Sequence, residues 1–236
     1  MSWTERTELL IGEEGMAKLS GAGITVVGCG GVGAYAAEML VRAGVSHIRI
    51  IDNDTVSESN LNRQLIALHS TIGESKVRVL GARLKDINPS IDMDMREDYI
   101  NEENVGSFIE GSDFVVDAID TLSPKIALIQ YCLKNNIPLV SSMGSGAKTD
   151  ATKVRITDIS KTYQCPLAHM LRKRLHKLGI QSGFQAVFSE ELPDRDSVTL
   201  EESRNKKSQV GTISYLPAVF GCVCAQAAIR RIVGIE

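Results

Sequence analysis

The sequence predicts an α/β fold in which helices cover a mainly parallel, doubly wound sheet. Two observations carry this prediction. Apolar runs of strand length alternate along the chain with longer segments whose apolar residues have helical spacing. The first unit, residues 24–54, combines a strand, a glycine-rich turn, an alanine-rich helix and a second strand that ends in an acid. At 236 residues, 43% hydrophobic and 23% charged, the chain has the size and composition of one globular domain.

The glycine-rich turn predicts a nucleotide site of the Rossmann-like kind. It contains Gly28, Gly30, Gly31 and Gly33, and it follows the strand 24–27 directly. Glycines let backbone N–H groups approach a phosphate, and the helix that follows adds a partial positive charge. Asp52 comes about 19 residues after Gly33, the distance at which an acid reaches a ribose hydroxyl. The alternative, a tight turn that only packs helix on sheet, stays open.

Polar residues follow the strand 47–51 at its carboxyl end, where open α/β sheets bind ligands. They are Asp52 and Asp54, and then the segment 59–64, which contains Asn60, Arg63 and Gln64. Residues 73–76 then open a helix that has Lys76 in its first turn and Val77, Leu80, Leu84 and Ile87 on its apolar face. A lysine in the first helical turn opposes the helix dipole, which suggests an anionic partner such as phosphate. A solvated lysine is an equally good interpretation of this position.

Two further strands complete the first half. Residues 91–95 alternate between apolar and charged side chains, as in a half-exposed strand. Residues 113–120 are a buried strand, and Asp120 lies at its carboxyl end, where an acid can hold Mg²⁺ beside a triphosphate. Ser123 and Pro124 are expected to open a helix that ends near Asn136, and the strand 138–142 follows.

The second half is expected to add antiparallel strands. Residues 152–158 and 184–188 read as strands. The helix from Pro166 has Leu167, Leu171, Leu175 and Leu178 on one face, while Arg172, Lys173, Arg174 and Lys177 lie on the other, with Lys161 just upstream. The bland interpretation is a solvated helix face. We expect a mobile loop over 190–210 and a final helix over 214–233 whose Cys222 and Cys224 lie in the core.

The cysteine content, the apolar runs and the net charge predict the cellular compartment and exclude some classes of site. Five cysteines without a signal peptide or a run of 18 apolar residues predict a reduced, cytoplasmic protein without a membrane span. No C-x-x-C pair exists, which disfavours a zinc ribbon. The net charge of −3 argues against indiscriminate polyanion binding, although a local basic patch is compatible with it. Residues 1–20 predict short helices broken at Gly12 and Gly15, in which Arg6 by itself reads as a surface charge.

The chain resembles the E1-like adenylating superfamily that includes the ThiF and MoeB proteins. The resemblance lies in the glycine turn, Asp52-x-Asp54, Asn60-x-x-Arg63-Gln64, Lys76 and Asp120. The resemblance implies binding of ATP and Mg²⁺ and adenylation of a carboxylate. It implies that the glycine turn cradles phosphates, that Asp52 and Asp54 face the nucleotide and that Asp120 holds Mg²⁺. It further implies that Asn60, Arg63, Gln64 and Lys76 surround the phosphates. Arg6 matches an arginine that completes the partner subunit's site, which implies a homodimer.

Within the superfamily, the chain is most similar to the branch of dehydratases that cyclise threonylcarbamoyladenosine in tRNA. Matching segments include 6–15, 123–125, 138–146 and 213–221, and they span nearly the whole chain. The resemblance implies an ATP-binding half over 1–150 and a substrate-facing half over 151–236 of a single domain. It implies tRNA contact by Lys161, Arg172, Lys173, Arg174 and Lys177, and by Lys206 and Lys207. It also suggests a monovalent cation, Na⁺ or K⁺, and a cysteine desulfurase or sulfur-acceptor partner. Cys165 departs from the pattern, because an acid is expected there.

Three other functions remain possible from the sequence. An enzyme that activates a ubiquitin-like sulfur carrier would share the ATP site, but that branch often carries paired C-x-x-C zinc ligands and would not need the basic helix. A nucleotide-sensing binding protein would not need so complete a phosphate and metal set. An NAD-dependent dehydrogenase would need a proton-relay residue, and no candidate emerges.

Overall fold

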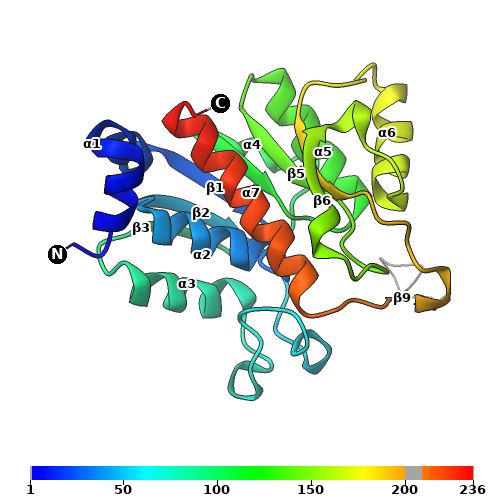
Figure 1. The fold of residues 1–236 in the computed structure, drawn as a ribbon, viewed down its shortest axis with the longest axis horizontal. Coiled ribbons are helices and arrows are strands. Elements are labelled where there is room, and N and C mark those ends of the chain that lie inside the picture. The colour runs from blue at the N-terminus through cyan, green and yellow to red at the C-terminus, as the bar shows by residue number, and fades with distance from the viewer. Residues whose placement is uncertain (1, 200–208, 236) are drawn as a thin grey trace.

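The computed structural model describes residues 2–199 and 209–235 (Figure 1). A seven-stranded sheet runs in the order β3-β2-β1-β4-β5-β7-β6. Its strands are β1 (Gly23–Val27), β2 (His47–Ile51), β3 (Asp92–Arg96), β4 (Phe114–Asp117), β5 (Leu139–Ser142), β6 (Val154–Asp158) and β7 (Gln185–Ser189). All neighbours are parallel except β6 and β7, which are antiparallel. The predicted fold class is therefore confirmed, with a single antiparallel pair in the main sheet.

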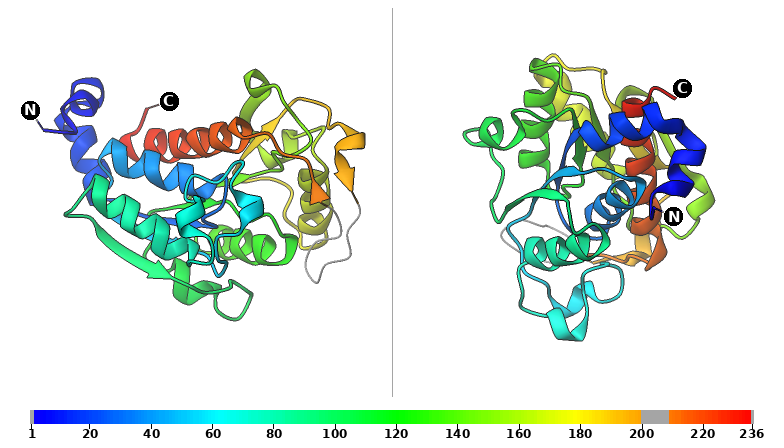
Figure 2. Two further views of the ribbon diagram at one scale, coloured as in Figure 1. Left: turned by 90° about the horizontal axis from the view of Figure 1, so that it is seen from below. Right: turned by 90° about the vertical axis from the view of Figure 1, so that its left-hand side faces the viewer.

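Helices cover both faces of the sheet. They are α1 (Glu5–Gly21), α2 (Gly33–Ala43), α3 (Lys76–Ile87), α4 (Val105–Ile109), α5 (Leu122–Lys134), α6 (Pro166–Lys177) and α7 (Tyr215–Val233). Side chains alternate across each strand, so Val26 and Val116 pack under the layer of α2, α3 and α7, while Val27 and Val115 pack under α4, α5 and α6. Figure 2 shows α2 and α7 side by side over one face.

The strand order creates a topological switch point in the middle of the sheet, where a ligand crevice is expected in this class of fold. From β1 the chain moves outward through β2 and β3, and it then returns to β4 on the other side of β1. Loops that follow β1 and β4 therefore leave the carboxyl edge in opposite directions. Open α/β sheets bind their ligands at such a switch point. The glycine turn follows β1, and Asp120 follows β4, so both lie at this crevice.

Helix α7 packs closely on α2. A Cβ on Gly221 would lie only 2.4 Å from the Val32 carbonyl oxygen, so only glycine permits this approach. Within the described part of the chain, α7 is the one helix whose length and composition would let it cross a membrane. No membrane span was expected from the sequence, because it has no run of 18 apolar residues. In the structure, however, Leu216, Phe220 and Cys224 on α7 are fully buried in the core, an arrangement that a core helix also produces.

Glycine breaks in the first helix were predicted half correctly. Gly12 interrupts α1 with φ 74° and ψ 170°, but the helix continues through Gly15. Gly15 is buried, and a Cβ there would lie 3.1 Å from Val233 of α7. This glycine therefore allows close packing and does not end the helix, so the predicted break at Gly15 is wrong.

Several other predicted helix boundaries, buried positions and loops differ from the structure. Helix α5 begins at Leu122, so Ser123 and Pro124 lie inside its first turn instead of capping it. Leu178 follows α6 and is 50% exposed, and Cys222 is exposed on α7, so neither belongs to the core. The expected loop 190–210 contains the antiparallel strands β8 (Val198–Thr199) and β9 (Gln209–Val210). Lys206 and Lys207 lie outside the described residues.

Candidate nucleotide-binding site

The glycine turn is held against the loop that follows β4. Gly28 has φ 92°, and a Cβ on it would lie 2.8 Å from the Ala118 carbonyl oxygen. A Cβ on Gly33 would lie 1.7 Å from the Gly28 carbonyl oxygen, which no side chain could tolerate. These two glycines close the turn sterically. Gly30 and Gly31 lie between them, where the N-terminus of α2 presents backbone N–H groups to an anion.

Asp52 connects the glycine turn to the end of β2. Its Oδ2 accepts a hydrogen bond from the Cys29 backbone N–H at 2.7 Å, and its Oδ1 accepts from the Asp54 N–H at 2.8 Å. Burial raises the pKa of Asp52, although the nearby Lys76 charge and these two N–H donors oppose the rise. Each carboxylate oxygen retains a lone pair for a further donor. Asp52 can therefore accept a ribose hydroxyl while its orientation stays fixed.

Lys76 and Asp54 form an ion pair beside the turn. Lys76 Nζ donates to Asp54 Oδ2 at 2.7 Å, and the Lys76 backbone N–H donates to the Asp54 carbonyl at 3.1 Å. Lys76 is buried, whereas the Asp54 side chain is 62% exposed. In this structure the anion beside Lys76 is a carboxylate of the same chain, and the predicted phosphate contact stays a prediction. An exposed carboxylate can yield its place to a phosphate.

The segment 59–64 lies next to the glycine turn. Asn60 is buried, and its Oδ1 accepts from the Ser57 N–H at 3.1 Å. The Gln64 amide lies beside Gly30, and its buried Oε1 has no hydrogen-bond partner within the described residues. An orphaned buried acceptor is costly, so this atom indicates a donor that a bound ligand or water supplies.

Arg63 packs its aliphatic part against Gly31. Its Nη1 donates to the Ser59 carbonyl and to Asn62 Oδ1, each at 2.8 Å. Asn62 in turn donates from Nδ2 to the Thr212 carbonyl at 2.9 Å. The arginine is therefore held at the rim of the turn and linked to the segment that precedes α7.

Asp120 is exposed in the loop between β4 and α5. Strand β4 ends at Asp117, so Asp120 lies three residues beyond it and not in the strand as predicted. A fully buried ion pair stands beneath this loop, between Asp117 and Lys125 at 2.7 Å. In the sequence, Lys125 stands out only as part of the segment 123–125 that matches the dehydratase branch. A sequence feature that could have indicated the buried ion pair is the position of Lys125 in the first turn of a mainly apolar helix.

Mg²⁺ fits a site at Asp120 that a nucleotide completes. No group of three or more His, Cys, Asp or Glu side chains in residues 2–199 and 209–235 is arranged to hold a metal ion. Mg²⁺ commonly takes only one or two carboxylates and obtains its other ligands from phosphates and water. A single exposed carboxylate in the loop that follows β4 is compatible with that pattern.

Arg6 does not join the site of its own chain. Helix α1 packs at the far end of α2, where Met16 and Thr4 surround Gly44, the residue that ends α2. The glycine turn is at the opposite end of α2, an 11-residue helix about 16 Å long. Arg6 is exposed there. The structure therefore keeps Arg6 away from the glycine turn of its own chain.

Most of the basic side chains on α6 and just upstream of it are exposed. Lys161, Lys173, Arg174 and Lys177 are exposed. Arg172 is half-buried, and its guanidinium donates a short hydrogen bond to Thr162 Oγ1. Thr162 donates in turn to the Ile159 carbonyl at 2.8 Å. Arg172 therefore anchors the start of α6 to the preceding segment, while the other four side chains are available to a ligand.

The buried thiols of Cys29 and Cys132 are poorly suited to act as nucleophiles. Burial raises the pKa of Cys29 well above its usual value, and the neighbouring Asp52 raises it further, so the thiol stays protonated. Burial likewise raises the pKa of Cys132 to about 12. Cys165 is buried at the start of α6, where the family pattern led us to expect an acid.

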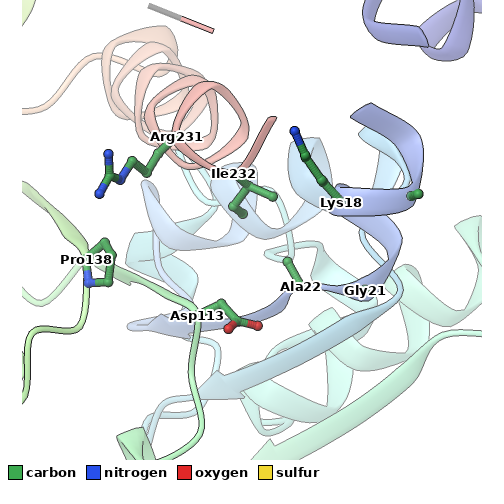
Figure 3. A pocket seen from close by; sticks show the side chains of 8 residues that line it. Lys18, Gly21, Ala22, Asp113, Pro138, Arg231 and Ile232 are labelled. Atoms are coloured by element: carbon green, nitrogen blue, oxygen red, sulfur yellow. The ribbon is translucent and has the colours of Figure 1, made fainter. Parts of the chain in front are cut away.

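A separate depression of about 440 Å³ lies at the amino edge of the sheet (Figure 3). Lys18, Asp113, Pro138 and Arg231 are among its lining residues. It contains none of the predicted site residues. It is also remote from the crevice, because β1 and β4 begin near it and end at the glycine turn.

Comparison with known proteins gives one consistent result. The ThiF family matches residues 5–236. The tRNA threonylcarbamoyladenosine dehydratase of Bacillus subtilis is 43% identical over 227 residues, which cover 92% of this chain and 89% of that protein. The dehydratase of Escherichia coli is 37% identical over 98% of this chain and 94% of its own length. A crystal structure of that Escherichia coli enzyme, TcdA, in complex with ATP superposes on this chain with a TM-score of 0.90. The two chains are 36% identical, and the superposition covers 98% of this chain and 93% of the other. A complex with AMP superposes equally well. The chain belongs to the ThiF family.

Proposed function

We propose that this chain is an ATP-dependent dehydratase that cyclises N6-threonylcarbamoyladenosine in tRNA. The observation that carries the proposal is the site at the switch point, where the glycine turn, Asp52 and Lys76 surround a single crevice. The chain is similar over nearly its full length to a dehydratase of this name that has been solved with ATP and with AMP. AMP is the leaving group when a carboxylate is activated as an acyl-adenylate.

The first step activates the free carboxylate of the threonyl side chain. A carboxylate oxygen attacks the α-phosphorus of ATP, a mixed anhydride with AMP forms, and pyrophosphate leaves. Negative charge builds up on the phosphates during this step. Lys76, Arg63 and the N–H groups at the start of α2 lie where they stabilise that charge, and fixed donors of this kind are the usual source of such stabilisation.

The second step closes the ring. The carbamoyl group of the same side chain attacks the activated carbonyl, and AMP leaves with one carboxylate oxygen, so that the nucleoside loses the elements of water. The attack is intramolecular, and effective molarities of about 10⁵–10⁸ M lower such barriers by roughly 7–11 kcal/mol. A covalent cysteine intermediate is therefore unnecessary, which agrees with the protonated state of Cys29.

Mg²⁺ belongs at Asp120 in this proposal, where it would neutralise phosphate charge beside the glycine turn. Asp120 would supply one carboxylate ligand, and the nucleotide would supply others. A monovalent cation, Na⁺ or K⁺, stays an expectation of the family resemblance, and we assign no residue to it. The same holds for a cysteine desulfurase or sulfur-acceptor partner.

The active assembly is proposed to be a homodimer in which Arg6 of each chain reaches the other chain's crevice. The position of α1 supports this, because Arg6 stands at the far end of α2 from its own glycine turn. The exposed apolar side chains of α1, Leu9 and Leu10, are 83% and 84% exposed, and a second chain would cover them. Five free cysteines, four of them buried, fit a cytoplasmic enzyme.

The exposed basic side chains of α6 are proposed to bind the tRNA backbone. Lys161, Lys173, Arg174 and Lys177 concentrate positive charge on one surface of a chain whose net charge is −3. Arg172, which is held beside Thr162, would add its positive charge to this tRNA contact. Backbone contacts of this kind orient a nucleic acid without reading its bases.

The nucleotide products test the proposal. ATP labelled in the α-phosphate should give AMP when threonylcarbamoylated tRNA is added, and it should give no ADP. Unmodified tRNA is the matched control and should leave ATP intact. Formation of AMP with a ubiquitin-like carrier protein, but not with the modified tRNA, would favour the sulfur-carrier function instead.

A further inference from the structure

A buried charged network lies under the loop that carries Asp120. Asp117 and Lys125 are both 0% exposed. Lys125 Nζ donates to Asp117 Oδ2 at 2.7 Å, and Ser141 Oγ donates to the same oxygen at 2.6 Å. These residues come from β4, α5 and β5. The network therefore joins two strands and a helix directly beneath the crevice.

The same network fixes the backbone immediately before Asp120. The Ile119 N–H donates to Asp117 Oδ1 at 3.1 Å, and the Ile119 carbonyl accepts from Lys125 Nζ at 2.8 Å. The peptide groups on both sides of Ile119 are thus held by the two charged side chains. From the other side, the glycine turn packs on Ala118, whose N–H also donates to the Val27 carbonyl at 2.8 Å. Asp120 directly follows Ile119, the residue that the two charged side chains hold.

Stability alone does not account for a charged pair in this place. Two charges lose their hydration when they are buried, and apolar residues of similar volume often give equal or greater stability. A charged pair that also binds the two peptide groups on either side of one residue, Ile119, does something that apolar residues cannot do. It selects one orientation of the loop.

We propose that Lys125 and Asp117 are positioning residues that orient Asp120 toward the metal ion on the nucleotide. This inference rests on the proposed function, because it takes Asp120 to be the Mg²⁺ ligand. Partners that orient a ligating carboxylate typically change metal affinity by about 10–100-fold when they are removed. The pair acts through Asp120 and contacts neither ATP nor tRNA itself.

The test measures how much Mg²⁺ increases the affinity of the whole protein for ATP. Calorimetry without tRNA gives the ATP affinity once in the presence of Mg²⁺ and once in the presence of EDTA, and the ratio of the two is the Mg²⁺-dependent gain. The double variant Asp117→Asn/Lys125→Met removes both charges and keeps the side-chain volumes, so neither charge is left buried alone. We expect it to lose about 10-fold or more of the Mg²⁺-dependent gain while its affinity in EDTA stays near that of the unmodified protein. Asp120→Ala gives the limit of complete loss. Lys134→Met, at the exposed end of the same helix, should leave the gain unchanged.

A folded double variant with the full Mg²⁺-dependent gain would overturn the inference. If the double variant does not fold, Ser141→Ala removes one donor to Asp117 and keeps the ion pair. A severalfold smaller gain then supports the inference, and an unchanged gain refutes it. A native protein whose ATP affinity does not respond to Mg²⁺ would refute the Asp120 assignment together with this inference. A native protein that binds Mg²⁺–ATP normally but leaves modified tRNA unchanged would refute only the proposed function.

Discussion

Lys76 and Asp54 are joined twice, through their side chains at 2.7 Å and through their backbones at 3.1 Å. The double link places the start of α3 against the loop that follows β2. Because Lys76 is buried while the Asp54 side chain is 62% exposed, the lysine is the fixed member of the pair. A phosphate entering the crevice can take over the ammonium group without moving α3.

Replacing Lys76 therefore tests the phosphate assignment. Lys76→Met keeps the aliphatic length and removes the charge, and we expect kcat to fall by about 10²–10³-fold, as when one preorganised donor is lost. AMP formation with modified tRNA is the measurement. Lys85→Met, near the other end of α3, is the matched control and should retain normal turnover. An active Lys76→Met enzyme would contradict the assignment.

The glycine turn should not tolerate a side chain at Gly33. A Cβ there would meet the Gly28 carbonyl oxygen at 1.7 Å, so Gly33→Ala should lower the free energy of unfolding by about 3 kcal/mol and abolish ATP binding. Urea unfolding and calorimetry measure the two effects. Gly21→Ala has no atom within 4 Å of the new Cβ and should change neither quantity appreciably.

Mixed dimers test whether Arg6 acts in the partner's site. Arg6→Ala and Asp120→Ala should each be nearly inactive alone. In a random mixture, half of the dimers contain one of each chain, and each such dimer regains one intact site, so about a quarter of the normal rate should return. Turnover after unfolding and refolding the two variants together is the measurement. Absence of recovery would place Arg6 outside the partner's site.

The basic surface of α6 should make tRNA binding depend on salt. Lys173→Ala/Lys177→Ala should reduce the slope of log K against log[salt] by about 0.7–0.9 for each lost phosphate contact. Binding is measured across a salt series with tRNA and inactive protein. Lys18→Ala/Lys85→Ala removes the same charge from α1 and α3 and should leave the slope unchanged. Equal slopes for both double variants would remove α6 from the interface.

Glu38 makes stability depend on pH. Burial disfavours its charged form, but hydrogen bonds from Arg83 and Arg42 outweigh burial, so the pKa of Glu38 is below its usual value. Its contribution is fully present above the unfolded-state pKa, about 4.3, and is lost as the pH falls through the lower folded-state pKa. Glu38→Gln should therefore cost about 2 kcal/mol at neutral pH and much less near pH 3. Urea unfolding at both pH values measures the difference, and the exposed Glu14→Gln is the control.

The sequence predicted the strands of the main sheet, and the position of the glycine turn at its carboxyl edge, because their signals are local. The glycine turn, Asp52 and Lys76 each stand beside an apolar run whose type and length fix their place at the carboxyl edge. The family resemblance, and no local pattern, singled out Gln64 and Arg6.

Features that depend on contacts distant in the chain were missed. Gly12 and Gly15 look alike in the sequence, but only Gly15 faces Val233 and so stays helical. The link between Asn62 and Thr212 joins residues 150 positions apart. Asp117 and Lys125 are close in sequence, yet their pairing depends on how α5 returns over β4, which periodicity does not specify.

The central claim is best tested on the nucleoside itself. Purified protein is incubated with ATP, Mg²⁺ and threonylcarbamoylated tRNA, and the nucleosides are then examined by mass spectrometry. The proposal predicts that threonylcarbamoyladenosine loses the mass of one water, only when ATP is present. An unchanged nucleoside, in a protein that binds ATP and tRNA normally, would contradict the proposal.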